Sequence, residues 1–351
     1  MSTLTVNKVS GKAPLKAKDF ATDQDVRWCP GCGDYSILKQ VQSVLAELEL
    51  DNDEVAVISG IGCSSRFPYY MKTYGMHSIH GRAPAIASGL RIANRDLSIW
   101  LITGDGDGLS IGGNHLLHIL RRNFNLNILL FNNQIYGLTK GQYSPTSEFN
   151  TKTKSTPYGS LDHPVNPPLF AMGANATFVA RSMDRDPKNL KEMLRRSNAH
   201  SGTSFLEIYQ NCNIFNDGAF FAFTDKATKS ANCVFLEQGQ PLIFGTNREL
   251  GIRLDGHRPS VVNLEKDGFS PNDLWIHDEK DPFKAQMLAH FFDDPKKREN
   301  NFLPRPFGVL YEIERPCYEE MLYEQLDQAT QQNGKGDLDN LIAGNVTWQI
   351  K

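Results

Sequence analysis

The sequence predicts an α/β fold in which a parallel sheet is flanked by helices. Short apolar runs alternate with segments of helical apolar spacing over residues 21–218, and alternating strands and helices join in parallel order through right-handed crossovers. Glycine-rich or polar turns follow several of the apolar runs. Because the carboxyl ends of parallel strands meet at one edge of the sheet, these turns are expected to form a common site.

The composition is that of a chain able to bury a large core. The 351 residues are 40% hydrophobic and carry a net charge of -3 without a long basic run, so no nucleic-acid partner is expected. No stretch approaches the roughly 20 apolar residues that cross a bilayer, and the N-terminus lacks an apolar signal core. The sequence therefore predicts a cytoplasmic protein with no membrane partner.

Three regions follow from the pattern. Residues 1–20 are polar and mildly basic and are expected to form an N-terminal arm. Residues 21–218 carry the alternating elements, with predicted strands at 54–60, 98–103, 126–131, 176–182 and 203–209, and predicted helices at 37–48, 85–93, 111–120, 170–174 and 190–198. Residues 143–168 form a long polar loop, typical of a lid or an interface. Residues 219–351 are expected to be a C-terminal extension that packs on the core or on a partner subunit.

The chain is organised around residues 104–142, which form one βαβ unit. The glycines of the GDGDG turn let the backbone approach phosphate oxygens, and the following helix offers free N–H groups to an anion. Asp105 would repel a bare diphosphate, so a divalent cation is expected between them. Mg²⁺ accepts carboxylate, amide and carbonyl oxygens together, and Asn133 lies at the end of the next strand.

Gly-Asp-Gly followed about 25 residues later by Asn-Asn resembles the thiamine diphosphate motif. The resemblance implies a thiamine diphosphate-binding fold, in which Mg²⁺ is held by Asp105, Asn133 and the backbone carbonyl of Ile135. Without that resemblance, either piece alone reads as an ordinary βα turn or strand end.

Four cysteines follow strands or precede a helix. Cys29 and Cys32 form a Cys-x-x-Cys turn before a helix, whereas Cys63 and Cys212 come shortly after predicted strands. In a parallel sheet these thiols share an edge with the diphosphate site. Four thiolates suit a [4Fe–4S] cluster or a tetrahedral Zn²⁺ equally well, so spacing alone leaves both open.

The segments WCPGCGD, GIGCSSR and YQNC, together with GDGDG and NNQIYG, resemble the β subunit of 2-oxoacid:ferredoxin oxidoreductases over residues 24–225. The resemblance implies a [4Fe–4S] cluster on Cys29, Cys32, Cys63 and Cys212. It also implies oxidative decarboxylation of a 2-oxoacid on thiamine diphosphate, coenzyme A as acyl acceptor and ferredoxin as electron acceptor. Cys233 and Cys317 match no motif and are interpreted as ordinary thiols.

The resemblance assigns residues around the cofactor and the substrate. Basic residues at Arg66 and Lys140 indicate that a second carboxylate is bound, which favours 2-oxoglutarate over pyruvate; the alternative is that both are solvated or phosphate-facing charges. His80 is expected to line the diphosphate pocket. The predicted cofactor-binding set is Gly62, Ser64, His80, Gly104, Asp105, Gly106, Asp107, Asn133, Ile135, Gly137, Leu138 and Thr139.

Thiamine activation needs a glutamate at the aminopyrimidine ring, and the sequence offers no obvious candidate. In the family this glutamate comes from the partner chain, so the resemblance implies an α subunit, or α plus γ, in an (αβ)₂ assembly. The nearest alternative is a pyruvate or broad 2-oxoacid enzyme of the same kind. Alternatives from other classes are a non-oxidative thiamine enzyme with a structural zinc site and an electron-transfer or scaffold subunit.

Overall fold

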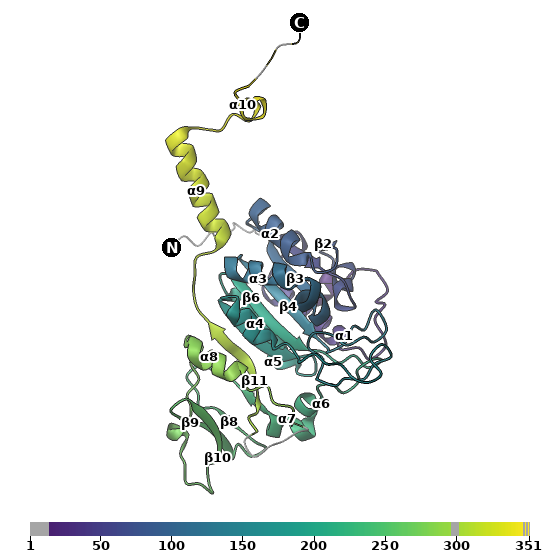
Figure 1. Cartoon of the computed structure of the whole chain (residues 1–351), viewed down its shortest axis with the longest axis vertical. Coiled ribbons are helices and arrows are strands. Elements are labelled where there is room, and N and C mark those ends of the chain that lie inside the picture. The colour runs from purple at the N-terminus through teal and green to yellow at the C-terminus, as the bar shows by residue number, and fades with distance from the viewer. Residues whose placement is uncertain (1–13, 296–301, 347, 349, 351) are drawn as a thin grey trace.

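The computed structural model describes residues 14–295, 302–346, 348 and 350. Its centre is an eight-stranded sheet in the order β2-β1-β3-β4-β6-β5-β11-β7 (Figure 1). The first six strands in this order pair in parallel, and β11 pairs antiparallel with β5. The strands are β1 (Val55–Ser59), β2 (Tyr74–His77), β3 (Ser98–Gly104), β4 (Leu126–Asn132), β5 (Phe178–Met183), β6 (Thr203–Tyr209), β7 (Cys233–Phe235) and β11 (Arg305–Glu312).

Helices cover both faces of the sheet, and each face has its own apolar core. One face packs against α1 (Asp34–Glu47) and α5 (Pro187–Ala199). The other packs against α2 (Ala83–Ala93), α3 (Gly113–Arg122), α4 (Pro167–Gly173) and α8 (Pro282–Ala289). Strands β3, β4 and β6 are buried along almost their whole length because both of their faces are covered. The near-continuous apolar sequences of β3 and β4 follow from that position.

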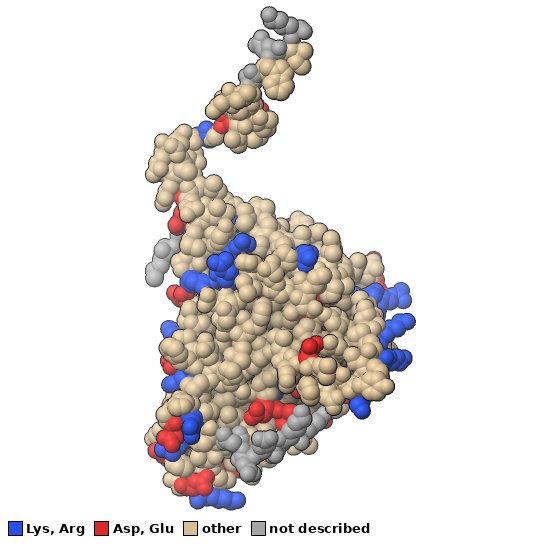
Figure 2. Space-filling view, viewed as in Figure 1, with Lys and Arg blue, Asp and Glu red and all other residues tan. Residues whose placement is uncertain are grey.

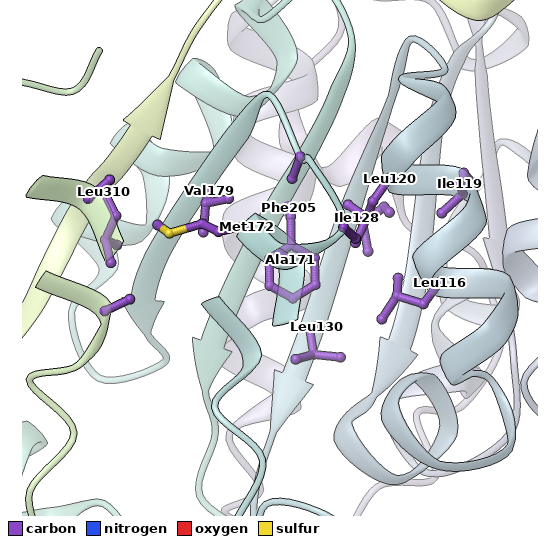
Figure 3. Close-up of a cluster of buried hydrophobic side chains, with 14 of the residues drawn as sticks. Leu116, Ile119, Leu120, Ile128, Leu130, Ala171, Met172, Val179, Phe205 and Leu310 are labelled. Atoms are coloured by element: carbon purple, nitrogen blue, oxygen red, sulfur yellow. The ribbon is translucent and has the colours of Figure 1, made fainter. Parts of the chain in front are cut away.

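The C-terminal part contributes to the same core. Leu310 of β11 lies with Val179, Met172 and Phe205 in one buried cluster (Figure 3). Because β7 and β11 complete one end of the sheet, the sheet continues across the boundary predicted at residue 219. A separate antiparallel sheet of β8 (Ile243–Phe244), β9 (Leu250–Asp255) and β10 (Arg258–Asn263) lies beside it.

The last two helices, α9 (Tyr318–Asn333) and α10 (Leu338–Ala343), extend away from the body (Figure 1). The first turns of α9 are anchored on the body because Glu319 pairs with buried Arg91 and the Tyr323 hydroxyl donates to the Ile92 carbonyl. Beyond them, Leu341 and Ile342 are more than 70% exposed. Figure 2 shows this arm as mostly uncharged, and on the body the charges of this face lie mainly along its margins.

The remaining elements are short: 3-10 or π turns at Ala17–Phe20, Asn52–Glu54, Ser64–Tyr70, Asp107–Ile111 and Pro271–Asp273, and helices α6 (Phe221–Thr224) and α7 (Lys226–Asn232). Residues 1–13 of the predicted N-terminal arm lie outside the described residues, and the end of that arm packs into the core through Phe20, which has no exposed surface. No helix in the described ranges is long and apolar enough to cross a membrane.

The predicted α/β fold is confirmed, with two differences. The strand β2 was missed, because its YGMH sequence is short and lies at the exposed edge of the sheet, where no apolar run is required. The sheet is also mixed rather than wholly parallel, since β7 and β11 run against the other six strands. Both of these strands come from the C-terminal part, for which the sequence predicted no elements.

Candidate active site at the carboxyl edge of the sheet

A pocket opens at the carboxyl edge of the central strands. The loops that follow β1, β3 and β4 form most of its wall, and His80 comes from the loop after β2. These four strands are neighbours in the sheet. All twelve residues of the predicted cofactor-binding set lie in its wall, together with Ile61, Cys63 and Tyr136. The sheet topology is the reason, because it brings these loops, which are distant in sequence, to one edge. No glutamate is among these lining residues.

Asp105 is the buried acid of the pocket. Its side chain is 2% exposed, and Oδ2 accepts hydrogen bonds from the hydroxyls of Ser144 at 2.5 Å and Thr146 at 2.6 Å. Burial raises the pKa of the Asp105 carboxyl, although the two hydroxyls offset part of that effect. A divalent cation would stabilise the ionised form. Asn133 and Ile135 lie in the same wall, so the carboxylate, amide and carbonyl oxygens expected for Mg²⁺ are present together.

Asp107 holds the pocket loops together. Its Oδ1 accepts the backbone N–H groups of Ile61 at 3.0 Å and Gly81 at 2.7 Å, and contacts Nδ1 of His80 at 2.5 Å. Its Oδ2 accepts the Thr103 hydroxyl at 2.6 Å. The carboxylate therefore joins three segments of the wall. It also occupies Nδ1 of His80, so Nε2 is the ring nitrogen that remains for a contact in the pocket.

Tyr136 closes one side of the glycine turn. Its hydroxyl donates to the Gly106 carbonyl at 3.0 Å, and a β-carbon at position 106 would lie 2.2 Å from Cε1 of the ring. Glycine is therefore required at position 106 by the close approach of the aromatic ring. Tyr136 was not among the predicted site residues, although it lies in the NNQIYG segment that carries the resemblance.

The four predicted cysteines converge beside the pocket. A β-carbon on Gly137 would lie 3.5 Å from Sγ of Cys212 and 3.6 Å from Sγ of Cys63. Trp28, next to Cys29, donates its indole N–H to the Cys63 carbonyl at 2.6 Å. These contacts bring the Cys-x-x-Cys turn to the ends of β1 and β6.

Burial disfavours a charge on these thiols unless a metal ion compensates it. Burial raises the pKa of Cys63 to about 12, with contributions from Asp34, Cys212 and Cys29, and burial likewise raises the pKa of Cys32. Thiolates at such positions need compensating positive charge, which iron or zinc supplies. No three His, Cys, Asp or Glu side chains in the described part of the chain are spaced to hold a metal ion as they stand. The sulfurs thus gather without forming a closed ligand set.

Arg66 and Lys140 lie on loops that flank the pocket, and neither is among its lining residues. Arg66 is half-buried, and its Nε donates to the Tyr70 hydroxyl at 3.2 Å. Lys140 is exposed, with φ at +73° in the turn after Thr139. The structure does not bring these two side chains into the pocket wall, so their role toward a substrate stays a prediction.

Two hydroxyl residues at the site were missed by the sequence analysis. Ser144 and Thr146 begin the long polar loop interpreted as a lid or an interface, but both are buried against Asp105. The signal available was the Ser-Pro-Thr-Ser run at residues 144–147, which ten residues separate from the Asn-Asn segment. The far part of the loop differs, since Tyr158 and Leu161 are 94% and 84% exposed.

Comparisons with known proteins agree with this site. Residues 60–208 match the family model of the thiamine pyrophosphate enzyme C-terminal TPP binding domain. The 2-oxoglutarate oxidoreductase subunit KorB of Mycobacterium tuberculosis is 48% identical over 341 residues, which are 96% of this chain and 89% of that protein. The chain belongs to the 2-oxoacid:ferredoxin oxidoreductase β-subunit family. It is thus one subunit of a multi-subunit oxidoreductase.

Other members match less of their own length or are less similar in sequence. The β subunit of 2-oxoacid:ferredoxin oxidoreductase 2 of Aeropyrum pernix is 41% identical over 57% of this chain and 64% of that protein. A solved 2-oxoglutarate:ferredoxin oxidoreductase from Magnetococcus marinus, with 2-oxoglutarate, coenzyme A and succinyl-CoA bound, superposes with a TM-score of 0.72 at 33% identity. That match covers 94% of this chain and 95% of the other. The family and the fold expected from the motifs are confirmed.

Proposed function

We propose that this chain is the β subunit of a 2-oxoglutarate:ferredoxin oxidoreductase. The enzyme converts 2-oxoglutarate and coenzyme A into succinyl-CoA and CO₂, and passes the two electrons released to ferredoxin. The reaction is reversible in principle, because its direction depends on the redox state of ferredoxin and on substrate levels.

The observation that carries the proposal is the position of Gly137. This residue lines the pocket of Asp105, and a β-carbon on it would contact the sulfurs of both Cys63 and Cys212. Cys63 also lines the pocket itself. A cofactor in the pocket and a cluster on the cysteines would therefore be separated by little more than one glycine, which suits electron transfer from one to the other.

The chain's own residues hold the two groups. Asp105, Asn133 and the Ile135 carbonyl would hold Mg²⁺, and the turn at residues 104–108 would receive the diphosphate. Bound thiamine diphosphate supplies the cleavage of the bond between the carbonyl and carboxyl carbons, and a [4Fe–4S] cluster on the cysteines accepts electrons singly. The lining residues include no glutamate for the aminopyrimidine ring, which supports completion of the site by the α partner.

The substrate is assigned from the match over nearly the whole chain. Both the Mycobacterium and Magnetococcus proteins are named for 2-oxoglutarate and match about 95% of this chain. The broad Aeropyrum 2-oxoacid protein matches little more than half of it. Arg66 and Lys140 are proposed to bind the distal carboxylate, provided that substrate or the α partner brings them together. A pyruvate or broad 2-oxoacid enzyme is the second candidate, because its β subunit shares the same motifs.

The assembly is proposed as (αβ)₂ with ferredoxin as electron acceptor, located in the cytoplasm, where reducing conditions keep free cysteines available for a cluster.

The test is reduction of a low-potential viologen by the anaerobically isolated complex. The rate is measured with 2-oxoglutarate, pyruvate and branched-chain 2-oxoacids, each with and without coenzyme A. Strong CoA-dependent preference for 2-oxoglutarate is expected. Preference for pyruvate would overturn the substrate assignment alone, and no reduction with any acid would overturn the oxidoreductase assignment.

A further inference from the structure

We propose that Glu207, oriented by Arg181, is a positioning residue for the metal carboxylate Asp105, acting through Asn132 and Thr146. This inference rests on the proposed function, because it assigns residues that support the Mg²⁺–diphosphate site. None of the four is among the predicted site residues, and none lines the pocket.

The four residues form a continuous chain of hydrogen bonds that ends at Asp105. Nε of Arg181 donates to Oε2 of Glu207 at 2.6 Å, and Nδ2 of Asn132 donates to Oε1 of Glu207 at 2.8 Å. The Thr146 hydroxyl lies 2.9 Å from Oδ1 of Asn132 and 2.6 Å from Oδ2 of Asp105. Each member is at most 2% exposed.

This series of contacts, called the relay below, follows the order of the strands in the sheet. Arg181 on β5 is the register partner of Glu207 on β6, and β6 pairs with β4, which ends at Asn132. Asp105 directly follows β3, the next strand. The relay therefore crosses four adjacent strands and arrives at the pocket one residue before Asn133. Arg181 also donates to the Pro306 carbonyl of β11 at 3.2 Å, so the C-terminal part supports its far end.

The charge of Glu207 decides how the Asn132 amide is turned. A carboxylate accepts hydrogen bonds only, so it fixes the NH₂ group of Asn132 toward itself. The amide oxygen must then face the other way, where it accepts from the Gln134 backbone N–H at 3.2 Å and meets the Thr146 hydroxyl. A neutral partner at position 207 would leave the Gln134 backbone N–H as the group that enforces this choice.

Thr146 stands between two acceptors with one hydroxyl proton. It serves either Asn132 or Asp105 at a time, and a cation that requires the ionised Asp105 would draw the hydroxyl proton to that carboxylate. Asn132 Oδ1 and Asp105 Oδ2 are thus alternative acceptors for this one proton, and their positions keep the hydroxyl between them. Thr146 donates to the same Oδ2 of Asp105 as Ser144 does, so the relay contributes, with Ser144, to leaving Oδ1 for the metal.

A contribution to stability does not by itself explain the buried Arg181–Glu207 ion pair. Desolvating a buried ion pair costs about as much as its attraction returns, and apolar residues of similar volume are often as stable. Outer residues that orient metal ligands, by contrast, typically change metal affinity by about 10–100-fold when they are altered. The connection to Asp105 gives the buried charges a function that apolar residues would not serve.

The experiment measures Mg²⁺-dependent binding of thiamine diphosphate to the assembled complex by equilibrium dialysis, with thermal unfolding of the same samples. Thr146→Val removes the hydroxyl and keeps the shape, and it is expected to weaken Mg²⁺ binding by about 10-fold or more. Thr146→Ser restores the hydroxyl and should recover most of the affinity. Glu207→Gln should weaken Mg²⁺ binding similarly. Because both changes break the same relay, the double variant should have about the same Mg²⁺ affinity as the single variant that binds Mg²⁺ less tightly.

Ser204→Ala is the matched control. Ser204 lies on the same strand as Glu207, is fully buried, and donates to Oδ1 of Asn127 on β4 at 2.9 Å, at the other end of the two strands. It should leave Mg²⁺ affinity unchanged. The proposal is overturned if folded Thr146→Val or folded Glu207→Gln binds like the unaltered complex, or if Ser204→Ala loses as much affinity. If Glu207→Gln fails to fold, the two Thr146 variants still decide. Absence of thiamine diphosphate binding by the unaltered complex would instead overturn the proposed function.

Discussion

Nδ1 of His80 lies 2.5 Å from Oδ1 of Asp107, and the same oxygen accepts two backbone N–H groups from separate loops. One buried carboxylate therefore sets both the ring orientation of His80 and the spacing of the pocket walls. Asp107 was predicted to be a cofactor-binding residue. Its contacts support a second role, in which it holds the loops that would surround the cofactor.

Two replacements of Asp107 distinguish the loss of its hydrogen bonds to the pocket loops from the loss of its charge. In Asp107→Ala, the donors that meet at Oδ1 lose their acceptor, so the free energy of unfolding should fall by about 3 kcal/mol or more. In Asp107→Asn, the amide oxygen can keep the place of Oδ1, and the Thr103 hydroxyl can turn to accept from the new NH₂ group. This variant should lose only about 1 kcal/mol. Urea unfolding of the assembled complexes measures both, and equal losses would show that the charge alone matters.

The glycine turn gives a second pair of variants. Gly106→Ala should destabilise the protein by about 1–3 kcal/mol, because the new β-carbon would lie 2.2 Å from the Tyr136 ring. In Gly104→Ala the new β-carbon would lie 3.5 Å from the Ser64 hydroxyl and 4.0 Å from the Phe131 carbonyl, both ordinary contacts, so this variant should fold normally. Since Gly104 lines the pocket, its variant should nevertheless bind thiamine diphosphate more weakly. Thermal unfolding and cofactor dialysis distinguish the two, and normal stability of Gly106→Ala would contradict the packing.

The sequence was sufficient to predict the strands of the central unit and the pocket at their carboxyl ends. Apolar runs reveal a strand that is buried on both faces, and a polar loop at the end of each run must lie at the same edge of a parallel sheet. This is why the positions of Cys63, Asp105 and Asn133 in the sequence are enough to predict that they lie close together.

What the sequence could not show are contacts that depend on three-dimensional packing. Ser144 and Thr146 reach Asp105 because a long loop folds back over the site, and no periodicity marks that path. Strand β11 joins the sheet about 120 residues after β5 in the chain, so local pattern does not reveal its partner. The Arg181–Glu207 pair was hidden for a related reason, because charged residues inside a predicted strand do not identify their neighbours.

The cysteine variants test the cluster. Serine at Cys29, Cys32, Cys63 or Cys212 should abolish or strongly reduce iron and acid-labile sulfide in the complex, since serine is a poor substitute for thiolate. Serine at Cys233 should leave both unchanged, because that thiol is buried in β7 and donates to the Phe223 carbonyl at 3.3 Å. Metal analysis and electron paramagnetic resonance after reduction are the measurements. Zinc in place of iron and sulfide would contradict the cluster.

Arg196 predicts how stability depends on pH in the C-terminal part. Its guanidinium pairs with Glu279 through two contacts of 2.7 Å and also contacts Glu312 at the end of β11. Burial alone would raise the pKa of Glu312, but the hydrogen bonds and charges of His200 and Arg196 lower it below its usual 4.5. The pair therefore contributes stability above about pH 4.5, and that contribution is lost as pH falls through the lowered pKa.

Arg196→Met should accordingly cost about 2 kcal/mol or more at pH 7, because two partly buried carboxylates lose their partner. The deficit should shrink as the pH falls below about 4.5 and through the lowered pKa of Glu312, where that carboxylate loses its charge. Arg195→Met is the control, since Arg195 forms exposed pairs with Glu47 and Glu192 and should cost less than about 1 kcal/mol. Denaturant unfolding across this pH range measures both, and a deficit independent of pH would contradict the assignment.

Two cations outside the pocket wall, Arg66 and Lys140, provide a test of the substrate assignment. If Arg66 and Lys140 bind the distal carboxylate of 2-oxoglutarate, removing either charge should raise KM for that acid about 10-fold or more and leave KM for pyruvate nearly unchanged, because pyruvate has no second carboxylate. Arg66→Gln and Lys140→Gln remove the charge, whereas Arg66→Lys and Lys140→Arg retain it and should recover part of the affinity. Glutamine is preferable to glycine at position 140, since φ is +73° there and glycine would also relax the backbone. Steady-state kinetics of the complex with both acids measure the difference. Equal increases for the two acids would mean that the cations act on a group that both substrates share, and the second carboxylate would then need another partner.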